Sequence, residues 1–399
     1  MLRNTYSVRR LSWRDLSRYR ENLSNSIYRI LVSGSRGKTG LVLDIYDILS
    51  NRLGDDYTVL GKVTGDMPRF RYMGVEYIID RGERPKNPFL DWENAGIIAS
   101  FPANIYVFEN QSIRGYTNGV IHRIIKPNIE LIPNLRLEHA ELGETLEDLA
   151  RTFSSQFEGL EYVIFGETIP EVFEVTYPIL EEAAIKYGVE LRVADVPHGY
   201  RDVLGIERVY IVQELLDIMG MEPLTQSEYN HLIHHITSRL TPRESPWGFR
   251  YIDVAKVNDP MSTEMVYNYV KRNYYGPIYI FAYFRGDRAD RTKFFIPFFE
   301  SLSVDDRVEK VILGGRYYRR VREVLGDKAV EYAAINIEDV FLDISSENGI
   351  LMFMVNGVHH DVDVVREMVV NPPLRVREKS MGEVSLGGVD SSQDNVRDM

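Results

Sequence analysis

The segment Gly34-Ser35-Arg36-Gly37-Lys38-Thr39 constrains the fold of this chain more than any other feature of its sequence. It follows the apolar stretch 28–32 and precedes an amphipathic stretch of helical periodicity, the context that a phosphate-binding loop requires. Glycines let backbone N–H groups turn inward, and the start of a helix adds positive potential. Val32 stands where the longer loop pattern has a glycine, so the shorter Gly-x-x-Gly-Lys-Thr form applies. The segment predicts that Lys38 reaches the β and γ phosphates of ATP and that Thr39 binds Mg²⁺.

Short apolar stretches alternate with helical stretches along the chain, which is typical of a parallel α/β sheet. In the first part the expected strands are 28–32, 58–61, 104–108, 129–132, 162–165 and 190–193, with helices at 39–53, 145–157 and 171–187. Further on, strands are expected at 251–254, 278–283, 308–313 and 350–355. The sequence therefore predicts an α/β fold with a P-loop ATP-binding domain, built on a parallel sheet, and a smaller C-terminal α/β domain.

A chain of 399 residues is too long for one ordinary domain, so we expect two. Two prolines lie in the segment Thr241–Trp247, and Gly248 follows it, a composition typical of a hinge. We predict an N-terminal extension over residues 1–25, a central domain over 26–248 and a C-terminal domain over 249–372. Residues 373–399 are polar and lack periodicity, which predicts a disordered tail.

Composition excludes several classes of protein. The net charge of −12 argues against general nucleic-acid binding, because neutralising phosphates needs a cationic face. The absence of cysteine excludes disulfides, thiolate zinc sites and a cysteine nucleophile. The sequence has no run of about 18 apolar residues, and its N-terminal segment lacks the apolar core of a secretory signal. We therefore expect a cytoplasmic protein with no membrane span of its own.

Two polar segments follow expected strands of the C-terminal domain. Charged residues crowd the segment Arg285-Gly286-Asp287-Arg288-Ala289-Asp290-Arg291-Thr292. Ligands bind at strand ends in open parallel sheets, so this segment is either part of a site or a solvated loop held by ion pairs. The second segment is Asn258-Asp259-Pro260. Asp259 either contacts a ribose hydroxyl or a metal-bound water, or caps the following helix, and capping is favoured on this evidence alone.

A carboxylate and an imidazole follow two expected strands of the central domain. Glu109 comes directly after the strand 104–108, and His139 comes seven residues after the strand 129–132. Two such side chains at neighbouring strand ends can share a divalent ion. Alternatively, His139 is an ordinary loop histidine. The sequence around His359 leaves its role open.

In this order the motifs resemble those of the Mur ligase superfamily, and most closely those of the poly-γ-glutamate synthase ligase subunit. The specific matches are the loop Gly34–Thr39 and the segment Arg285–Thr292, which is similar to the family's Arg-Ala-Asp-x-x-Asp-Arg-Thr signature. Supporting matches are Gly61–Gly65 with Arg69, Glu109, Asn134–His139, Gly248-Phe249-Arg250, Asn258-Asp259 with Ser262-Thr263, and Gly357-Val358-His359. They extend over residues 26 to 370, so the resemblance implies a Mur-ligase-like fold for nearly the whole chain.

The resemblance also implies an activity and a set of residues. A member of this superfamily uses ATP and Mg²⁺ to convert a carboxylate into an acyl-phosphate and joins it to the amine of an amino acid, here expected to be glutamate. ATP-binding residues are implied at Gly34–Thr39, Asn258, Asp259 and Arg291, and Mg²⁺ ligands at Thr39, Glu109 and His139. The implied catalytic residues are Lys38, Arg250, Arg288 and Asp290, and the implied substrate residues are Thr64, Arg69 and His359.

Departures from the family leave alternatives open. Bacterial members begin with a membrane-anchoring apolar segment that this chain lacks, so a membrane-protein partner and a homo-oligomer both stay open. Asn110-Gln111-Ser112 differs from the family's residues at this point, which leaves the substrate open. The alternatives are a P-loop ATPase or kinase without ligation, a non-catalytic assembly protein, and a cell-wall or folate-type peptide ligase.

Overall fold

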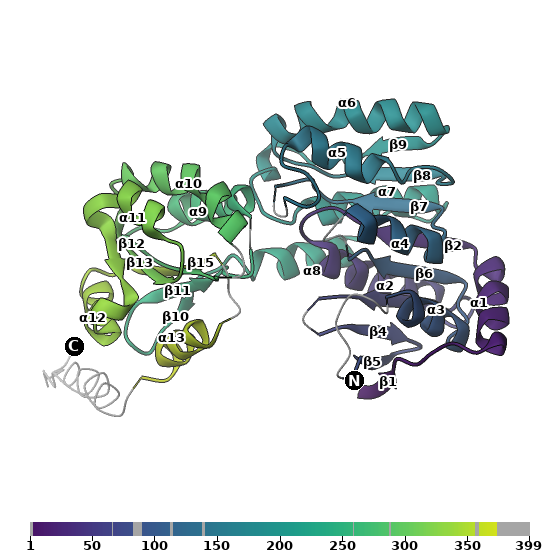
Figure 1. The fold of residues 1–399 in the computed structure, drawn as a ribbon, viewed down its shortest axis with the longest axis horizontal. Helices are drawn as coiled ribbons and strands as arrows, with labels where there is room; N and C mark the ends of the chain where they lie inside the picture. Colours follow the sequence, from purple (N-terminus) through teal and green to yellow (C-terminus); the bar gives the residue numbers. More distant parts are fainter. Residues whose placement is uncertain are drawn as a thin grey trace, which may run out of the picture. The chain divides into compact units, whose positions relative to one another are not determined.

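The computed structural model describes residues 3–65, 67–82, 90–111, 115–137, 140–257, 259–286, 289–355 and 359–372. His139, Asn258, Arg288 and the segment 373–399 lie outside the described residues, as do the side chains of Asp290 and Arg291. The chain forms two compact units (Figure 1). The first comprises Met1–Arg239 and Asp259–Tyr269, and the second comprises Leu240–Asn258 and Val270–Met399. Asp259, which the sequence analysis assigned to the C-terminal domain, therefore lies in the first unit.

The first unit is built on a sheet whose described strands run in the order β1-β5-β4-β3-β6-β2-β7-β8-β9. Neighbouring strands are parallel except for the antiparallel pairs β3–β4 and β4–β5. The strands are β1 (Arg3–Ser7), β2 (Tyr28–Val32), β3 (Val59–Val63), β4 (Arg69–Tyr72), β5 (Val75–Asp80), β6 (Ile105–Glu109), β7 (Ile129–Ile132), β8 (Tyr162–Phe165) and β9 (Glu190–Val193).

All six strands predicted for this part of the chain are present, and β1, β4 and β5 extend the sheet beyond them. These additional strands gave no apolar signal; in β4, for example, Phe70 is the one fully buried residue. The segment that we set apart as an N-terminal extension contributes β1, which pairs with β5, and the helix α1 (Trp13–Asn25). Ser12 and Asp15 form a capping box that starts this helix.

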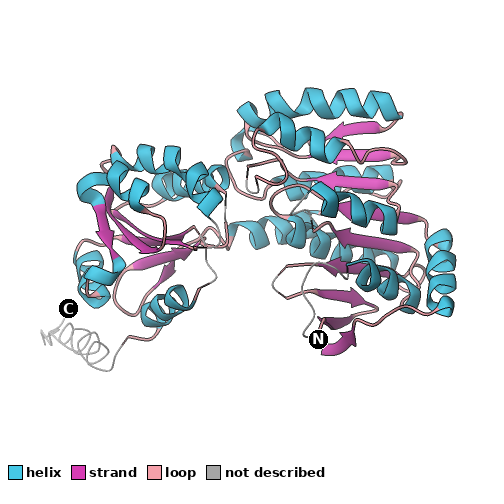
Figure 2. Ribbon diagram, viewed as in Figure 1, coloured by secondary structure: helices cyan, strands magenta, loops and turns pink. Residues whose placement is uncertain are grey.

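Helices pack on both faces of the sheet, as Figure 2 shows in cyan. Successive residues of a strand point to opposite faces. In β3, Leu60 therefore packs in a core with residues of α1, α3 and α4, while Gly61 lies against Tyr46 of α2. The helices of this unit after α1 are α2 (Lys38–Leu53), α3 (Leu90–Ser100), α4 (Gly115–Ile125), α5 (Leu146–Ser154), α6 (Pro170–Tyr187), α7 (Glu207–Ile218) and α8 (Gln226–Thr237).

The second unit contains a smaller sheet with the strand order β10-β11-β15-β12-β13-β14 among the described residues. All neighbours are parallel except β10 and β11. The strands are β10 (Arg243–Glu244), β11 (Arg250–Asp253), β12 (Ile278–Phe284), β13 (Val308–Gly315), β14 (Ala329–Glu331) and β15 (Ile350–Met354). The helices are α9 (Pro260–Asn273), which contributes to both units, α10 (Ala289–Ser303), α11 (Arg319–Leu325), α12 (Ile337–Ser346) and α13 (His360–Val370).

The four strands predicted for the C-terminal part are present as β11, β12, β13 and β15. Every residue of β12 is buried, as expected for a central parallel strand with both faces covered. Trp247, at the end of the predicted hinge, is buried in the core of this unit, where its indole N–H donates to the Met368 carbonyl at 2.8 Å. None of the described helices has the length and apolar character that crossing a membrane requires.

Candidate functional site

The predicted phosphate loop connects β2 to α2 in the first unit. Gly34 and Gly37 have φ angles of +86° and +82°, which residues with a Cβ adopt at a cost. A methyl group on Gly34 would lie 2.6 Å from the Asn134 carbonyl oxygen, so the loop requires glycine there for space as well. The loop leads directly into the first turn of α2, which leaves backbone N–H groups available to an anion.

Asn134, after β7, fixes the conformation of the loop. Its side-chain oxygen accepts the Arg36 backbone N–H at 2.8 Å, and its amide nitrogen donates to the Arg36 carbonyl at 3.2 Å. The same nitrogen donates to the Glu207 carboxylate at 2.9 Å. Ser35 is tied to the same segment, because its hydroxyl accepts the Arg136 N–H and donates to the Arg136 carbonyl, both at 2.8 Å. The loop is therefore held in place by hydrogen bonds to the chain after β7.

Lys38 and Thr39 stand at the start of α2 with polar groups toward the loop and the neighbouring strand end. The Lys38 ammonium donates to the carbonyl oxygens of Gly34 and Ser35 at 2.7 and 3.1 Å. The Thr39 hydroxyl donates to the Glu109 carboxylate at 3.0 Å, and the Thr64 backbone N–H donates to the same oxygen at 2.8 Å. The structure thus brings together the predicted metal residues Thr39 and Glu109 and the predicted substrate residue Thr64.

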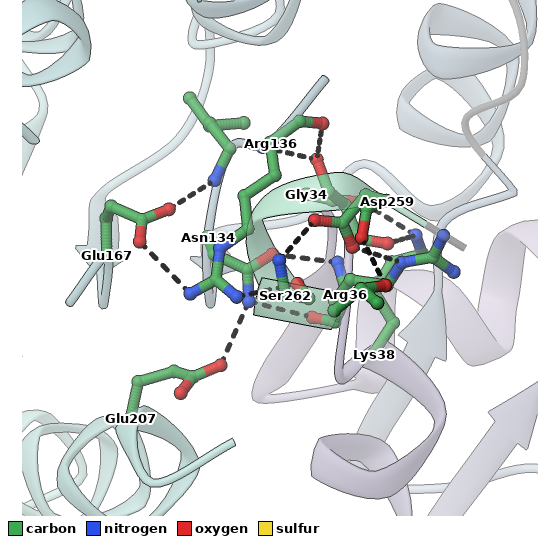
Figure 3. A network of polar contacts seen from close by, with 12 residues as sticks. Gly34, Arg36, Lys38, Asn134, Arg136, Glu167, Glu207, Asp259 and Ser262 are labelled. Carbon is green, nitrogen blue, oxygen red and sulfur yellow. Dashed lines mark hydrogen bonds and ion pairs between the residues drawn. The ribbon is translucent and has the colours of Figure 1, made fainter. Parts of the chain in front are cut away.

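A buried ionic network lies behind the loop (Figure 3). Arg136 is fully buried and donates to Glu167 at 3.1 Å and to the Ser262 hydroxyl at 2.7 Å. Burial alone would lower the pKa of Arg136, but the carboxylates of Glu167, Glu207 and Asp259 raise it overall. Burial raises the pKa of the Glu207 carboxyl, although Arg136 counteracts that effect. The network therefore keeps a charged guanidinium inside the protein, next to the phosphate loop.

Asp259 caps α9, one of the two roles that the sequence left open, and it also pairs with the phosphate loop. Its carboxylate accepts the Ser262 backbone N–H at 2.7 Å, which confirms the predicted helix cap at the start of α9. Its other oxygen accepts from the Arg36 side chain at 2.9 Å, and Asp259 is fully buried (Figure 3). Arg36 of the phosphate loop is thereby paired with the first turn of α9.

Glu207 and Arg208 open α7 beside the phosphate loop, and sequence reasoning missed both. The Arg208 guanidinium pairs with Asp44 of α2 and is buried. It packs so closely on α2 that a methyl group at Gly40 would lie 2.7 Å from its central carbon. A larger residue at position 40 would therefore have to displace the end of a side chain 168 positions further along the chain. No local pattern could have indicated this contact.

Two predicted residues have partners away from these groups. Arg69 begins β4, and its guanidinium pairs with Glu76 of β5 at 3.3 Å. Arg250 begins β11, where its guanidinium donates to the Tyr275 carbonyl at 3.0 Å and lies over the Tyr274 ring. In the parallel sheet of the second unit, Arg250 is thus at the amino edge, opposite to the carboxyl edge that precedes Arg288. Arg250 and the carboxyl end of β12, after which the segment Arg285–Thr292 begins, therefore lie at opposite edges of this sheet.

His359 lies at the carboxyl edge of the second sheet, directly before α13. Its ring stacks on the Tyr283 ring with a centroid distance of 4.3 Å, and its Nε2 lies 3.1 Å from the Tyr283 hydroxyl. The Tyr283 hydroxyl donates to Asp361 at 3.0 Å. A predicted substrate residue is therefore part of a polar cluster with a tyrosine and a carboxylate.

Residues 244–371 match the family model described as the poly-gamma-glutamate synthase CapB C-terminal domain. The second unit is therefore similar to this family and is termed the CapB-type domain. The match runs from β10 to the end of α13 and confirms the resemblance found in the sequence. The CapB-type domain includes the cluster around His359 and the segment Arg285–Thr292. No curated protein matches the chain.

Solved structures with similar folds extend the comparison to both units. Folylpolyglutamate synthase from Thermotoga maritima has 15% sequence identity and a TM-score of 0.52, covering 91% of this chain and 95% of that chain. FolC from E. coli in complex with ADP has 14% identity and a TM-score of 0.58, covering 90% and 94%. MurF ligase from Thermotoga maritima in complex with ADP has 12% identity and a TM-score of 0.55, covering 93% and 84%. The chain with its CapB-type domain therefore has the two-domain Mur ligase fold, as predicted.

Proposed function

We propose that this protein is an ATP-dependent amide ligase of the poly-γ-glutamate synthase type. It would activate a substrate carboxylate as an acyl-phosphate and join it to the amine of an amino acid, with glutamate the favoured one. One observation carries the proposal: a phosphate loop with Lys38, Thr39 and Glu109 in place occurs in the same chain as a CapB-type domain. The ADP complexes of FolC and MurF, which share this fold, support ATP as the phosphoryl donor.

The loop has the features that binding of ATP phosphates requires. Gly34 and Gly37 turn the backbone so that N–H groups can face an anion, and the first turn of α2 adds its positive potential. Lys38 now donates to two carbonyls of its own loop, contacts that the stronger charge-assisted bonds to phosphate oxygens would replace. Lys38 would then neutralise charge on the phosphoryl group during transfer.

Thr39 and Glu109 fit Mg²⁺ in number and chemistry. Both offer oxygen atoms, and Mg²⁺ in phosphoryl-transfer sites uses one or two protein carboxylates together with substrate phosphates and water. The described residues contain no group of three His, Cys, Asp or Glu side chains that could hold a metal unaided, which is consistent with a shared site of this kind. His139 is proposed as a third protein ligand. The bound ion would neutralise charge on the phosphates.

The remaining residues act by binding and positioning. The substrate carboxylate attacks the γ-phosphorus, the P–O bond between the β and γ phosphates breaks, and ADP leaves. The amine then attacks the acyl carbon and loses a proton, while phosphate leaves with the electron pair of the C–O bond. The second step needs no protein nucleophile, in keeping with the absence of cysteine. Arg288, Asp290 and Arg291 are proposed to act on the transferring phosphoryl group or the nucleotide. Asp259 is proposed to do the same once Arg36, its present partner, has an anionic ligand. Thr64, beside Glu109, is proposed to contact the carboxylate substrate.

The decisive experiment measures ADP release by the purified protein with a panel of amino acids and carboxylate acceptors, with mass spectrometry of the products. The acceptors include glutamyl peptides, a folate and a cell-wall peptide precursor, so that each ligase alternative has its own outcome. We expect ADP release that depends on the amino acid, together with an amide product. ADP release without any amine dependence, and without an amide product, would indicate a P-loop ATPase or kinase instead.

The variant Lys38→Ala tests the loop itself. Removing the cation at the β and γ phosphates should abolish ATP turnover, while folding is kept because this half-buried side chain donates to carbonyls of its own loop. Lys186→Ala, an exposed lysine of α6, is the matched control and should retain wild-type turnover. A folded Lys38→Ala protein with near wild-type activity would show that Gly34–Thr39 is not the phosphate loop.

A further inference from the structure

The carboxyl edge of the CapB-type sheet carries polar side chains that the steps above do not use. Tyr283 is the penultimate residue of β12, His359 is the N-cap of α13, which follows β15, and Asp361 lies in the first turn of α13. The strands β12 and β15 are parallel neighbours, so both lead to the same edge. Ligands of open parallel sheets bind outside this edge.

Tyr283 is held in place on both sides. A methyl group at Gly314 of β13 would lie 2.7 Å from the Tyr283 ring, so glycine makes room for the ring on that side. The His359 ring stacks on Tyr283 with an angle of 26° between the ring planes. The tyrosine hydroxyl therefore has a fixed position at the sheet edge.

A closed chain of hydrogen bonds orients Asp361. Its backbone N–H donates to Nδ1 of His359 at 3.2 Å, so a neutral His359 carries its proton on Nε2. Nε2 then donates to the Tyr283 hydroxyl at 3.1 Å, and that hydroxyl donates to Oδ2 of Asp361 at 3.0 Å. The side chain of Asp361 is 42% exposed, and Oδ1 receives no hydrogen bond from a described residue. One carboxylate oxygen is thus fixed by the tyrosine, while the other accepts no hydrogen bond from a described residue and belongs to a partly exposed side chain.

Arg316 supplies the opposite charge at the same place. It follows Gly315 at the end of β13, and its backbone N–H donates to the Phe284 carbonyl at 2.8 Å. The side chain is exposed and makes no ion pair with any described residue. A methyl group on Gly286, just after β12, would lie 3.3 Å from Cδ of Arg316, so this side chain runs along the chain that leaves β12. Burial and Asp361 raise the pKa of Tyr283 to about 12, and Arg316 opposes them. A cation and an anion therefore lie at the same sheet edge as the fixed hydroxyl.

We propose that Asp361 and Arg316 bind the incoming amino acid in its zwitterionic form. Asp361 pairs with the substrate ammonium group, and Arg316 pairs with a substrate carboxylate, since guanidinium is suited to bidentate binding of carboxylates. Tyr283 and His359 are positioning residues that orient Asp361. The assignment rests on the proposed function in naming glutamate as the amino acid. Capping of α13 by His359 explains the Asp361 N–H bond, but it explains neither the remaining carboxylate oxygen nor an arginine that forms no ion pair with any described residue.

The test compares binding of L-glutamate and of glutarate, which lacks the amine, to the full chain by calorimetry. Asp361→Asn should weaken glutamate binding about ten-fold or more, the range expected for one charge-assisted contact, and leave glutarate binding nearly unchanged. Arg316→Ala should weaken both. Asp361→Glu should restore part of the glutamate affinity. Matched controls are Asp363→Asn, in the same turn of α13, and Arg319→Ala, which is exposed on α11.

Two results would overturn the proposal: equal loss of both ligands in Asp361→Asn, or glutamate affinity unchanged in both main variants. Absence of glutamate binding to the wild-type chain would also overturn it. Failure of the ligase function is detected separately, by supplying ATP, a glutamyl peptide and hydroxylamine, which traps an acyl-phosphate as a hydroxamate without an amino-acid site. Wild-type protein without hydroxamate would refute the ligase, whereas hydroxamate formation with unaltered glutamate binding in the variants would refute the amino-acid site alone.

Discussion

Replacing Arg136 by methionine tests the buried network behind the phosphate loop. Methionine fills part of the same space without charge, so the variant leaves the carboxylates of Glu167 and Glu207 buried without their cation. Breaking a buried ion pair in this way costs about 3–5 kcal/mol. Total stabilities of domains are about 5–15 kcal/mol, so the loss is a large part of the whole.

The contacts that remain around Glu167 place the expected loss of stability at the lower end of this range. Its carboxylate still accepts three backbone N–H groups, from Leu135 at 3.1 Å, Thr168 at 2.9 Å and Ile169 at 3.0 Å. Hydrogen bonds from backbone donors stabilise a carboxylate without a cation. We therefore expect Arg136→Met to lower the free energy of unfolding of the first unit by about 3 kcal/mol.

Tryptophan fluorescence can report on the first unit alone. Trp13 and Trp92 lie in the first unit and Trp247 in the core of the second, so a Trp247→Phe background leaves the first unit as the source of the signal. Urea unfolding in this background should show a midpoint lowered by about 1 M for a denaturant slope of about 3 kcal/mol/M.

Arg151→Met, at an exposed position of α5, is the matched control and should change stability by no more than about 0.5 kcal/mol. If Arg136→Met unfolds at the same urea concentration as this control, the buried cation does not hold the network, and the reasoning fails.

Two further substitutions test the surroundings of the loop. Burial raises the pKa of Glu207 above its unfolded value of about 4.3, so the stability linked to this group is present at low pH and lost as pH rises through the folded pKa. Glu207→Gln keeps an acceptor for Asn134 and should be at least as stable as wild type at pH 7. In urea unfolding, its advantage in stability over wild type should shrink as the pH is lowered toward 5. An advantage that grows toward pH 5 would contradict this reasoning. Gly40→Ala should gain helix propensity of about 1 kcal/mol but displace Arg208, for a net loss of about 1–2 kcal/mol in thermal unfolding. Gly115→Ala, which has open space in α4, should show no such loss.

Much of the fold was predictable because its signals are local. Buried parallel strands appear as short apolar runs, so β2, β6, β7, β8, β12 and β15 could be located from sequence. The strands β1, β5 and β4 at one end of the sheet could not, because one face of such a strand, or both, carries polar and half-buried residues. Their pairing depends on hydrogen bonds to distant segments, which leave no periodic pattern.

The sequence by itself determined the phosphate loop, its place between a strand and a helix, and the approach of Thr39 to Glu109. Positive φ angles demand glycine, and polar residues after parallel strands must meet at one edge of the sheet.

Only the tertiary structure decided what surrounds that loop. The residues that converge on it lie 95 to 168 positions beyond Thr39 and are Asn134, Arg136, Glu167 and Glu207. The charges of this network are tolerated in the interior because each lies beside a partner of opposite sign or a hydrogen-bonding group. The packing of α7 and α9 against the loop brings such partners together, and that packing exists only once the chain has folded.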